Sequence, residues 1–261
     1  MSMDLIKEIV QVPGVLKEAY GDLAKPGVEQ AGKALGTVIG LGNTILWPVA
    51  LANEKAKIAL EKNLEKYRKR LENIPKEEIA EVAPELGVPI GEKIAYVTNE
   101  ELSDMYVELL AKASIGSSAS LAHPSFVNVI NNLSPDEAVL LKALRNTQSL
   151  PFIETRLQRN GVEGWNTLDP IYSPLSKITG LSFPNNVVAY ISNFEGLGIL
   201  QVRTDIYMVG EGIYEPLELE SKARYKGLED IPEPKMQITC QKGKIDVTPF
   251  GRLFLQACFA K

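Results

Sequence analysis

The chain has 261 residues, of which 45% are hydrophobic and 23% are charged, and its formal net charge at pH 7 is −5. This composition is typical of a soluble globular protein with a substantial core, and it excludes an intrinsically disordered chain. The charge is spread over both halves of the sequence. That distribution excludes a dedicated basic domain for nucleic acid.

The cysteines and the first residues predict the compartment. Cys240 and Cys258 lie in different predicted elements and lack metal-ligand spacing, so we expect free thiols in a reducing, cytoplasmic setting. The first residues, MSMDLIKEIVQVPG, include acidic side chains. They lack the basic region, long apolar core and cleavage site of a secretory signal.

The first half of the chain, residues 1–132, is predicted to be a helical domain. The expected helices are Asp4–Val10, Val15–Ala24, a glycine-rich helix that breaks near Trp47-Pro48, Glu54–Asn73, Glu92–Val97, Asn99–Ser114 and Pro124–Asn131. Residues 75–91 are rich in proline and glycine, so we expect them to form an irregular connector. Asn99 is expected to cap the helix that follows it.

The glycine-rich helix contains a run without charge from Ala34 to Asn53. About 20 apolar residues are enough for a helix to span a bilayer. The apolar side chains of this run fall on one side of a helical wheel, however, and Asn43 and Pro48 oppose insertion. Membrane insertion of this segment is therefore predicted to be marginal.

Three glycines recur at four-residue spacing in this helix, at Gly32, Gly36 and Gly40. Each interior glycine costs a helix about 0.8–1 kcal/mol relative to alanine, and close approach of another backbone would offset that cost. The partner is left open between the chain's own Glu54–Asn73 helix, a second subunit, and lipid after a triggered rearrangement in which Trp47 would lie at the membrane interface. We predict Gly32, Gly36, Gly40 and Trp47 as interaction residues.

The helix over Glu54–Asn73 carries a short heptad seam. Its apolar residues step by four and three, at Leu60, Leu64, Tyr67, Leu71 and Ile74. Two heptads are too few for an autonomous coiled coil. We therefore expect the seam to pack on the preceding helix.

The second half, residues 133–261, is predicted to be a winged-helix-like α+β domain, which makes the whole chain mainly α. Ser134-Pro135-Asp136-Glu137 has the pattern of a capping box and is expected to open a helix over Asp136–Asn146. The elements expected after it are an irregular stretch over 148–184, a helix Asn185–Glu195, a strand-like run Gln201–Val209, an insertion over 210–236 with a short helix near Leu217–Tyr225, a hairpin of Gln237–Gln241 and Lys244–Val247, and a last helix Phe250–Phe259 capped by Thr248.

The sequence offers little for catalysis. His123 is the chain's one histidine and stands before a predicted helix start, where capping or packing is the simpler interpretation. Cys258 lies in an apolar helix and is expected to be a buried small hydrophobe. No GxSxG, phosphate-binding glycine loop or metal-ligand spacing is present. We predict no enzymatic activity, no catalytic residue, no metal and no cofactor.

Duplex DNA is not the expected partner of the winged-helix-like domain. The helix in the recognition position, NNVVAYISNFE, has no lysine or arginine, and affinity for DNA depends mainly on cations that neutralise phosphates. Lys242 and Lys244 on the predicted wing are the candidate DNA contacts. Binding to a protein is favoured, and a DNA-binding transcriptional regulator is the alternative.

Several segments of the chain resemble the Abi-alpha family of bacterial abortive-infection proteins. They are KPGVEQAGKALGTVIGLGNTILWPVALANEKAK, NEELSDMYVELLAKAS, AHPSFVNVINNLSPDEAVLLKAL and the C-terminal DVTPFGRLFLQAC. The most specific parts are His123-Pro124 with Phe126, and Leu133 through Glu137. Residues 150–245 match no family pattern.

The resemblance implies a role in defence against bacteriophage, with arrest of the infected cell as the outcome. It brings no established catalytic residue. The expected partner is a protein or a second copy of the chain, with a phage component and a membrane surface as further options.

Overall fold

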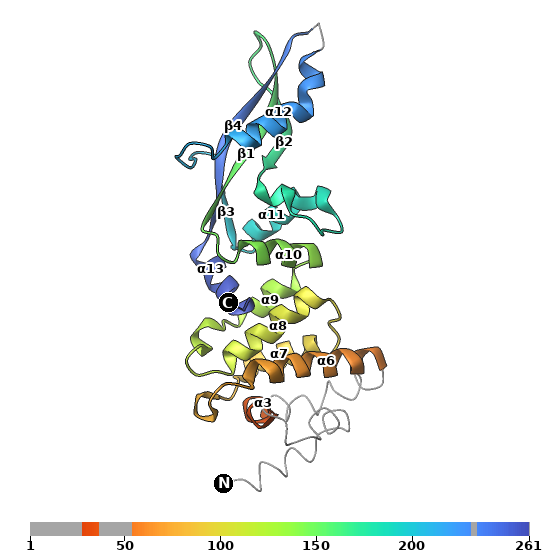
Figure 1. The fold of residues 1–261 in the computed structure, drawn as a ribbon, viewed down its shortest axis with the longest axis vertical. Coiled ribbons are helices and arrows are strands. Elements are labelled where there is room, and N and C mark those ends of the chain that lie inside the picture. The colour runs from red at the N-terminus through yellow and green to blue at the C-terminus, as the bar shows by residue number, and fades with distance from the viewer. Residues whose placement is uncertain (1–27, 37–53, 231–233, 261) are drawn as a thin grey trace. The chain divides into compact units, whose positions relative to one another are not determined.

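The computed structural model describes residues 28–36, 54–230 and 234–260. These residues contain more helix than strand, and their strands form one four-stranded sheet. The chain divides into two compact units, one of residues 1–138 with 253–261 and one of residues 139–252. Figure 1 shows the elements of both units in chain order.

Unit 1 is helical in its described part. Its helices are α3 (Val28–Ala34), α6 (Glu54–Leu71), α7 (Pro84–Ile94), α8 (Glu100–Ala113) and α9 (Ser125–Asn131), with 3₁₀ turns η1 (Lys76–Glu78) and η2 (Ala119–Leu121). The predicted helices over Glu54–Asn73, Asn99–Ser114 and Pro124–Asn131 are confirmed. The expected helices Asp4–Val10 and Val15–Ala24 lie outside the described residues.

The heptad seam of α6 forms much of the core of unit 1. Leu60, Leu64, Tyr67 and Leu71 are all buried. Within the described residues, α6 packs against α8, α7 and α3. Buried apolar area of this kind, rather than helix propensity, is the main source of stability for such a helix.

The predicted irregular connector over residues 75–91 is confirmed for residues 75–83, apart from the turn η1, and is wrong for residues 84–91, which belong to α7. Pro84 occupies the first turn of α7, where its missing N–H costs nothing, and Pro89 lies inside the helix. Leu86, Ile90 and Ile94 recur at four-residue spacing and are buried. Burial of this face outweighs the cost of the internal proline, so the helix begins at Pro84 and ends at Ile94 instead of running over Glu92–Val97.

The predicted helix caps are confirmed at three helix starts. The Leu102 N–H donates to Asn99 Oδ1 at 3.0 Å. The Glu137 N–H donates to Ser134 Oγ at 3.3 Å, and the Ser134 N–H donates to Glu137 Oε2 at 2.6 Å, which is a capping box at the start of α10 (Pro135–Leu144). The Gly251 N–H donates to Thr248 Oγ1 at 2.8 Å.

Unit 2 is built on an antiparallel sheet with strand order β2-β1-β4-β3. The strands are β1 (Ser149–Arg159), β2 (Asn166–Tyr172), β3 (Leu200–Arg203) and β4 (Met236–Val247). The helical elements around them are η3 (Pro174–Lys177), η4 (Pro184–Asn186), α11 (Val187–Gly196), α12 (Glu215–Glu229) and α13 (Pro249–Cys258), of which α13 continues into unit 1. The predicted helices over 185–195, 217–225 and 250–259 are confirmed as α11, α12 and α13.

The prediction of irregular structure over residues 148–184 is wrong, because β1, β2 and η3 lie there. The neighbouring residues Phe152 and Ile153 are both buried, although they point to opposite faces of β1. Ile153 packs under α12 with Tyr172, Tyr214 and Leu217. The strand therefore changes its buried face in mid-course and lacks the simple alternation that marks a strand in sequence.

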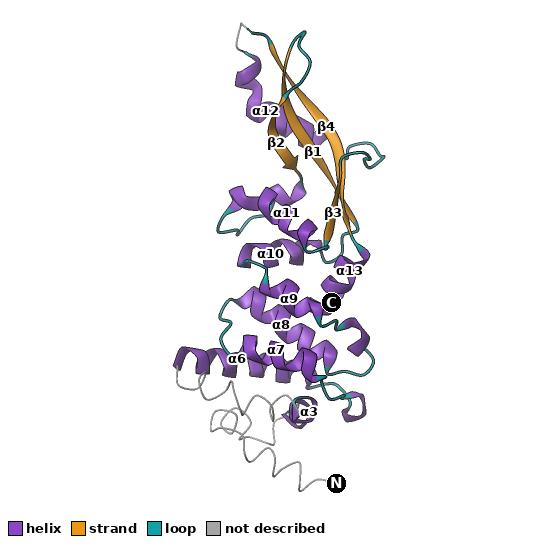
Figure 2. Cartoon of the chain, turned by 180° about the vertical axis from the view of Figure 1, so that it is seen from behind, coloured by secondary structure: helices purple, strands orange, loops and turns teal. Residues whose placement is uncertain are grey.

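The predicted hairpin around Lys242-Gly243 is also wrong. β4 runs without a break from Met236 to Val247 and pairs with β1 along most of that length. A Cβ added at Gly243 would lie 2.4 Å from Phe152 Cζ. The glycine provides room for a ring on the paired strand and does not form a turn. Figure 2 shows β4 as one long arrow beside β1, and β3 is shorter than the predicted run Gln201–Val209.

Candidate functional site

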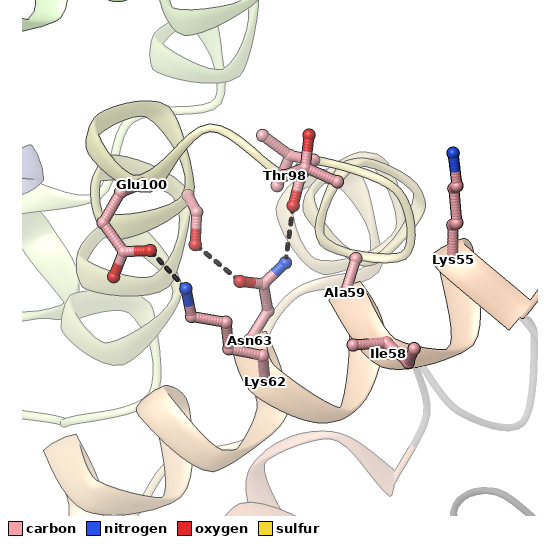
Figure 3. A pocket seen from close by; sticks show the side chains of 9 residues that line it. Lys55, Ile58, Ala59, Lys62, Asn63, Thr98 and Glu100 are labelled. Carbon is pink, nitrogen blue, oxygen red and sulfur yellow. Dashed lines mark hydrogen bonds and ion pairs between the residues drawn. The ribbon is translucent and has the colours of Figure 1, made fainter.

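A pocket of about 290 Å³ lies in unit 1, between the first turns of α6 and the segment that joins α7 to α8. The residues that line it are Lys55, Ile58, Ala59, Lys62, Asn63, Val97, Thr98, Glu100 and Ser103. Figure 3 shows Lys62 and Glu100 directed toward each other at one end of the pocket. Lys55 stands toward the other end, and Ile58 and Ala59 lie between the two lysines.

Asn63 forms the polar floor of the pocket. Its buried amide donates to the backbone oxygens of Ile94, at 2.8 Å, and Val97, at 3.1 Å, and it accepts from Ser103 Oγ. The side chain therefore joins α6 to the end of α7 and to α8. Since a buried amide without partners would destabilise the fold, these bonds hold the floor in one geometry.

Two lysines and two carboxylates form a network of ion pairs at one end of the pocket, of which Lys62 and Glu100 line it. Lys66 Nζ lies 2.8 Å from both Glu100 Oε1 and Asp104 Oδ1, and it donates to Ser103 Oγ at 3.0 Å. Lys62 Nζ pairs with the other oxygen of Glu100. Hydrogen bonds from Lys62 and Lys66 lower the pKa of Glu100 from 4.5 to about 2.

The lowered pKa of Glu100 predicts a small, acid-sensitive contribution to stability. The ionised carboxylate stabilises the folded chain above about pH 4.5, and this contribution disappears as the pH falls toward 2. Glu100→Gln should lower the free energy of unfolding at pH 7 by about 0.5 kcal/mol, because more than half of the side chain is exposed to solvent. Urea unfolding measures the difference.

The difference between the Glu100→Gln variant and the wild type should shrink as the pH falls from 4.5 toward 2. Glu85→Gln is a matched control, because Glu85 is an exposed carboxylate in the first turn of α7. A Glu100→Gln difference that stays constant over this range would contradict the assignment.

The middle of the pocket is apolar. Ile58 is 63% exposed, whereas Ala59 is buried. Together with Val97 they offer apolar contact area beside charged groups. This arrangement combines apolar contact area with charged and polar groups, as sites for small ligands do.

The predicted interaction residues fall only in part within the described chain. Gly32 is half-buried in α3, and Gly36 is exposed just beyond that helix. A Cβ added at Gly36 would meet nothing nearer than Glu81 Oε1, at 3.9 Å. Gly40 and Trp47 lie outside the described residues.

The side chains that bury α3 in unit 1 are those of Ala31, Ala34 and Leu35. The glycines do not form this contact. The Val82 N–H donates to the Ala34 backbone oxygen at 3.0 Å. Lys33 Nζ donates to the backbone oxygen of Lys76 at 3.2 Å. Gly32, Gly36 and Gly40 together are called the glycine strip. At Gly36 the buried face of α3 is thus offset from this strip.

The predicted DNA contacts Lys242 and Lys244 lie in unit 2, on the continuous strand β4. Lys242 Nζ lies 3.2 Å from Glu218 Oε1 and 5.3 Å from the centre of the Tyr214 ring. Lys244 Nζ lies 2.9 Å from Asp246 Oδ2. Both ammonium groups therefore have carboxylate partners within the unit.

His123 and Cys258 have structural contacts. The Ser125 N–H donates to His123 Nδ1 at 3.1 Å at the start of α9, and the imidazole lies 5.7 Å from the Phe126 ring. Cys258 is buried, and burial raises the pKa of its thiol well above 9. The capping interpretation of His123 and the packing interpretation of Cys258 agree with these contacts.

The described residues contain neither a helix that is long and apolar enough to cross a membrane nor a cluster of three or more side chains suited to a metal ion.

Asn63 and its pocket were not predicted. Asn63 is the one amide side chain in α6, among many charged residues. That isolation is the signal that could have drawn attention to it, but its partners lie 31–40 residues further along the chain.

A family model described as abortive infection alpha matches residues 59–258, which is most of the chain. The chain belongs to this family. The match includes α6 from Ala59 onward, the pocket-lining residues of α8 and the whole of unit 2. The family resemblance seen in the sequence is thereby confirmed, and the match extends over residues 150–245, which had matched no pattern. The resembling segment of residues 25–57 lies outside the match.

One solved structure is similar to part of the chain. It is an uncharacterized protein from the hydrocarbon-degrading marine bacterium Alcanivorax borkumensis SK2, at 18% identity and a TM-score of 0.32, and the alignment covers 54% of this chain and 94% of that chain. At this level the likeness assigns neither fold nor function. No curated protein matches the chain.

Proposed function

We propose that the chain is a phage-defence protein of the abortive-infection type that acts through contact with another protein, or with a second copy of itself, and not through catalysis. The family match over residues 59–258 carries the defence role. The proposal of a non-catalytic mode of action rests on the contacts of two side chains. The two residues best suited to catalysis, His123 and Cys258, are engaged in capping and packing.

Expression of the chain in a phage-sensitive bacterium tests this function. Plaque counts across a varied phage panel should fall for at least one phage relative to an empty vector. His123→Ala and Cys258→Ala should keep the protection wherever the variant folds, because neither side chain takes part in a reaction. Protection lost in a variant that remains folded would contradict the non-catalytic proposal.

We further propose a winged-helix-like arrangement for part of unit 2. Its support is the order of elements: α11 precedes β3, and β1, β4 and β3 are neighbours in the sheet. In this interpretation residues 204–235, which join β3 to β4, take the place of the wing. The wing would then precede Lys242 and Lys244 in the chain, whereas the sequence predicted both lysines on the wing itself.

Protein contact is favoured over DNA contact for this unit. α11 has no lysine or arginine, and Lys242 and Lys244 are paired with carboxylates. Binding to duplex DNA would need cations that are available to phosphates. Micromolar affinity for DNA that weakens steeply with salt, and that is lost in the double variant Lys242→Ala/Lys244→Ala, would instead support a regulator.

The glycine strip is proposed as part of the contact surface. Gly36 is open to solvent and has room for a side chain. Gly36→Leu should therefore leave the melting temperature of the purified chain unchanged while it reduces protection in the plaque assay, because leucine would block close approach of a partner. Gly40→Leu tests the next position of the strip.

Gly227→Leu is the matched control for these variants, since Gly227 is also exposed and has no atom outside its own helix within 4 Å of an added Cβ. It should keep full protection. If Gly36→Leu lowers the melting temperature and the protection together, the strip packs inside the chain. Full protection with unchanged stability would show that it has no partner.

A further inference from the structure

The two faces of the sheet in unit 2 differ in what covers them. Ile153 packs under α12, and Thr155 Oγ1 lies 2.6 Å from Ser221 Oγ of that helix. Successive residues of a strand point to opposite faces. The side chains that β1 and β4 direct away from α12 form three cross-strand pairs: Glu154 with Gln241, Arg156 with Thr239, and Gln158 with Gln237. These six residues are called the polar face.

Trp165 lies against this face. It ends the turn that joins β1 to β2, and the centre of its ring is 4.0 Å from the guanidinium carbon of Arg156. A cation stacked at this distance attracts the face of the ring. Trp165 is nevertheless 53% exposed. With one side of the indole against Arg156, its other side is open to a ligand.

Glu154 holds this stack in place. Its carboxylate accepts a hydrogen bond from Arg156 Nη2 at 2.7 Å and one from Thr167 Oγ1 at 2.9 Å, and it is also bonded to the Trp165 side chain. The hydrogen bond from Arg156 is the main reason that the pKa of Glu154 lies below its ordinary value. Because the indole is already fixed in the free chain, little conformational entropy would be lost there on binding.

The stack is kept at a local cost. Within the described residues, Arg156 Nε is the one buried side-chain nitrogen or oxygen atom without a hydrogen-bond partner. A buried donor without a partner destabilises a fold. The chain keeps the guanidinium on the Trp165 ring in spite of this cost. Local costs of this kind are concentrated at functional sites.

The surroundings of the stack are neutral and hydrogen-bonding. Besides the charged pair, the polar face consists of Gln158, Gln237, Thr239 and Gln241. None of these four side chains forms a hydrogen bond within the part of the chain that the structure describes. Amide groups and hydroxyl groups can both donate and accept. The polar face therefore offers unused donors and acceptors beside an open aromatic ring.

This chemistry favours a neutral ligand that is rich in hydroxyl groups. Nucleic acid would need cations that are free to meet phosphates, whereas the Arg156 guanidinium is already paired with Glu154. An apolar partner would bury the amides of Gln237 and Gln241 without hydrogen bonds, which is costly. The C–H bonds on the face of a sugar ring, in contrast, suit the negative face of an indole ring.

We propose that the polar face binds a neutral oligosaccharide, in which one sugar ring stacks on Trp165 and neighbouring hydroxyl groups bond to Thr239 and Gln241. Adjacent strands lie about 4.8 Å apart. The hydroxyl groups at the edge of a stacked ring would therefore reach side chains on β4. The inference goes beyond the proposed defence function and does not depend on it.

Titration of the full chain with cellohexaose, maltohexaose and chitohexaose tests this proposal, with hexagalacturonic acid as an anionic control of equal length. Calorimetry measures the dissociation constants. At least one neutral hexasaccharide should bind with a dissociation constant of about 1 mM or below, as expected for an open face that buries little area. It should bind more tightly than the anionic control, because the polar face has no unpaired cation.

Removal of the aromatic ring should have the largest effect. Trp165→Ala should weaken binding of the neutral hexasaccharide by at least about tenfold. Tyr207→Ala is the matched control, because Tyr207 is 59% exposed and its ring meets Tyr214 in the cluster under α12, away from the polar face. This control should bind as tightly as the unchanged chain.

A second pair of variants tests the hydrogen-bonding part of the polar face and does not disturb the stack. Gln241→Ala changes an exposed side chain and should weaken binding about threefold or more. Gln201→Ala is its control, because Gln201 is an exposed glutamine on β3 that pairs with Asp246 and points to the α12 side. If Trp165→Ala does not fold, the comparison of Gln241→Ala with Gln201→Ala decides.

Three results would overturn the proposal. The first is no binding of any neutral hexasaccharide up to about 10 mM. The second is binding that is unchanged in folded Trp165→Ala and in Gln241→Ala, or tighter binding of the anionic control. The third is protection from phage that is lost in folded Trp165→Ala although no oligosaccharide binds, which would assign the polar face to a protein partner.

Discussion

Replacing Phe254 by alanine is expected to lower the free energy of unfolding by about 3–5 kcal/mol. Phe254 and Phe126 are fully buried in unit 1, and their rings meet edge to face with centroids 5.3 Å apart. The substitution removes the apolar area of one ring and leaves a cavity that its close-packed surroundings can fill only in part. It also removes the ring contact itself, which is worth about 0.5–1.5 kcal/mol.

Urea unfolding of the purified chain measures the effect of Phe254→Ala. Leu219→Ala is the matched control, because Leu219 is a large apolar residue that is 70% exposed on α12. This control should change the free energy of unfolding by no more than about 0.5 kcal/mol. A loss below about 1 kcal/mol for Phe254→Ala would contradict the packing of α13 against α9 within unit 1.

Gly251→Ala is expected to lower the free energy of unfolding by about 3 kcal/mol. Gly251 lies in the first turn of α13, where a Cβ would stand 2.2 Å from the backbone oxygen of Ile199. A backbone atom cannot rotate away as a side chain can, so either α13 or the segment before β3 has to shift. The loss should appear in thermal unfolding as well as in urea.

Gly227→Ala makes the same chemical change in another helix and should have the opposite sign. Gly227 lies in α12 and has no atom within 4 Å of an added Cβ. Alanine should raise the free energy of unfolding there by about 0.5–1 kcal/mol through the intrinsic preference for helix. A stabilising effect of Gly251→Ala would show that α13 does not approach Ile199 this closely.

Local signals in the sequence predicted local structure well. Asn99, Ser134 and Thr248 were identified as caps, and each accepts a hydrogen bond from the first turn of its helix. The seam of α6 was read from its apolar spacing, and its residues from Leu60 to Leu71 are buried. Caps and helical periodicity depend on residues within one or two turns, so a single sequence contains the information.

Elements that depend on distant contacts were not predicted. α7 forms despite Pro89 because one face of the helix is buried. β1 lacks the alternating pattern by which a strand is recognised, because Phe152 and Ile153 are buried on opposite faces. Gly243 was taken for a turn, although its role is to admit the Phe152 ring from the paired strand, 91 residues away. None of these contacts can be read from neighbouring residues.

The candidate site also has features that local sequence patterns reveal and features that depend on distant contacts. Glycine spacing drew attention to Gly36, and the structure shows an open position there. The pocket was missed because it exists only where α6 meets the segment before α8. Its floor depends on bonds from Asn63 to Ile94, Val97 and Ser103. The family, in contrast, could be recognised from short segments of sequence before any element was placed.

Infection of growing cultures at two phage doses tests the central claim most directly, that the chain protects a bacterial population by abortive infection. Cells that express the chain and cells with an empty vector are infected either with far fewer phage than cells or with more phage than cells, and growth and phage yield are followed. Expressing cultures should survive the low dose, stop growing at the high dose, and release fewer phage per infected cell. Equal phage yield from expressing and control cells, for every phage tested and with the chain folded and present, would contradict it.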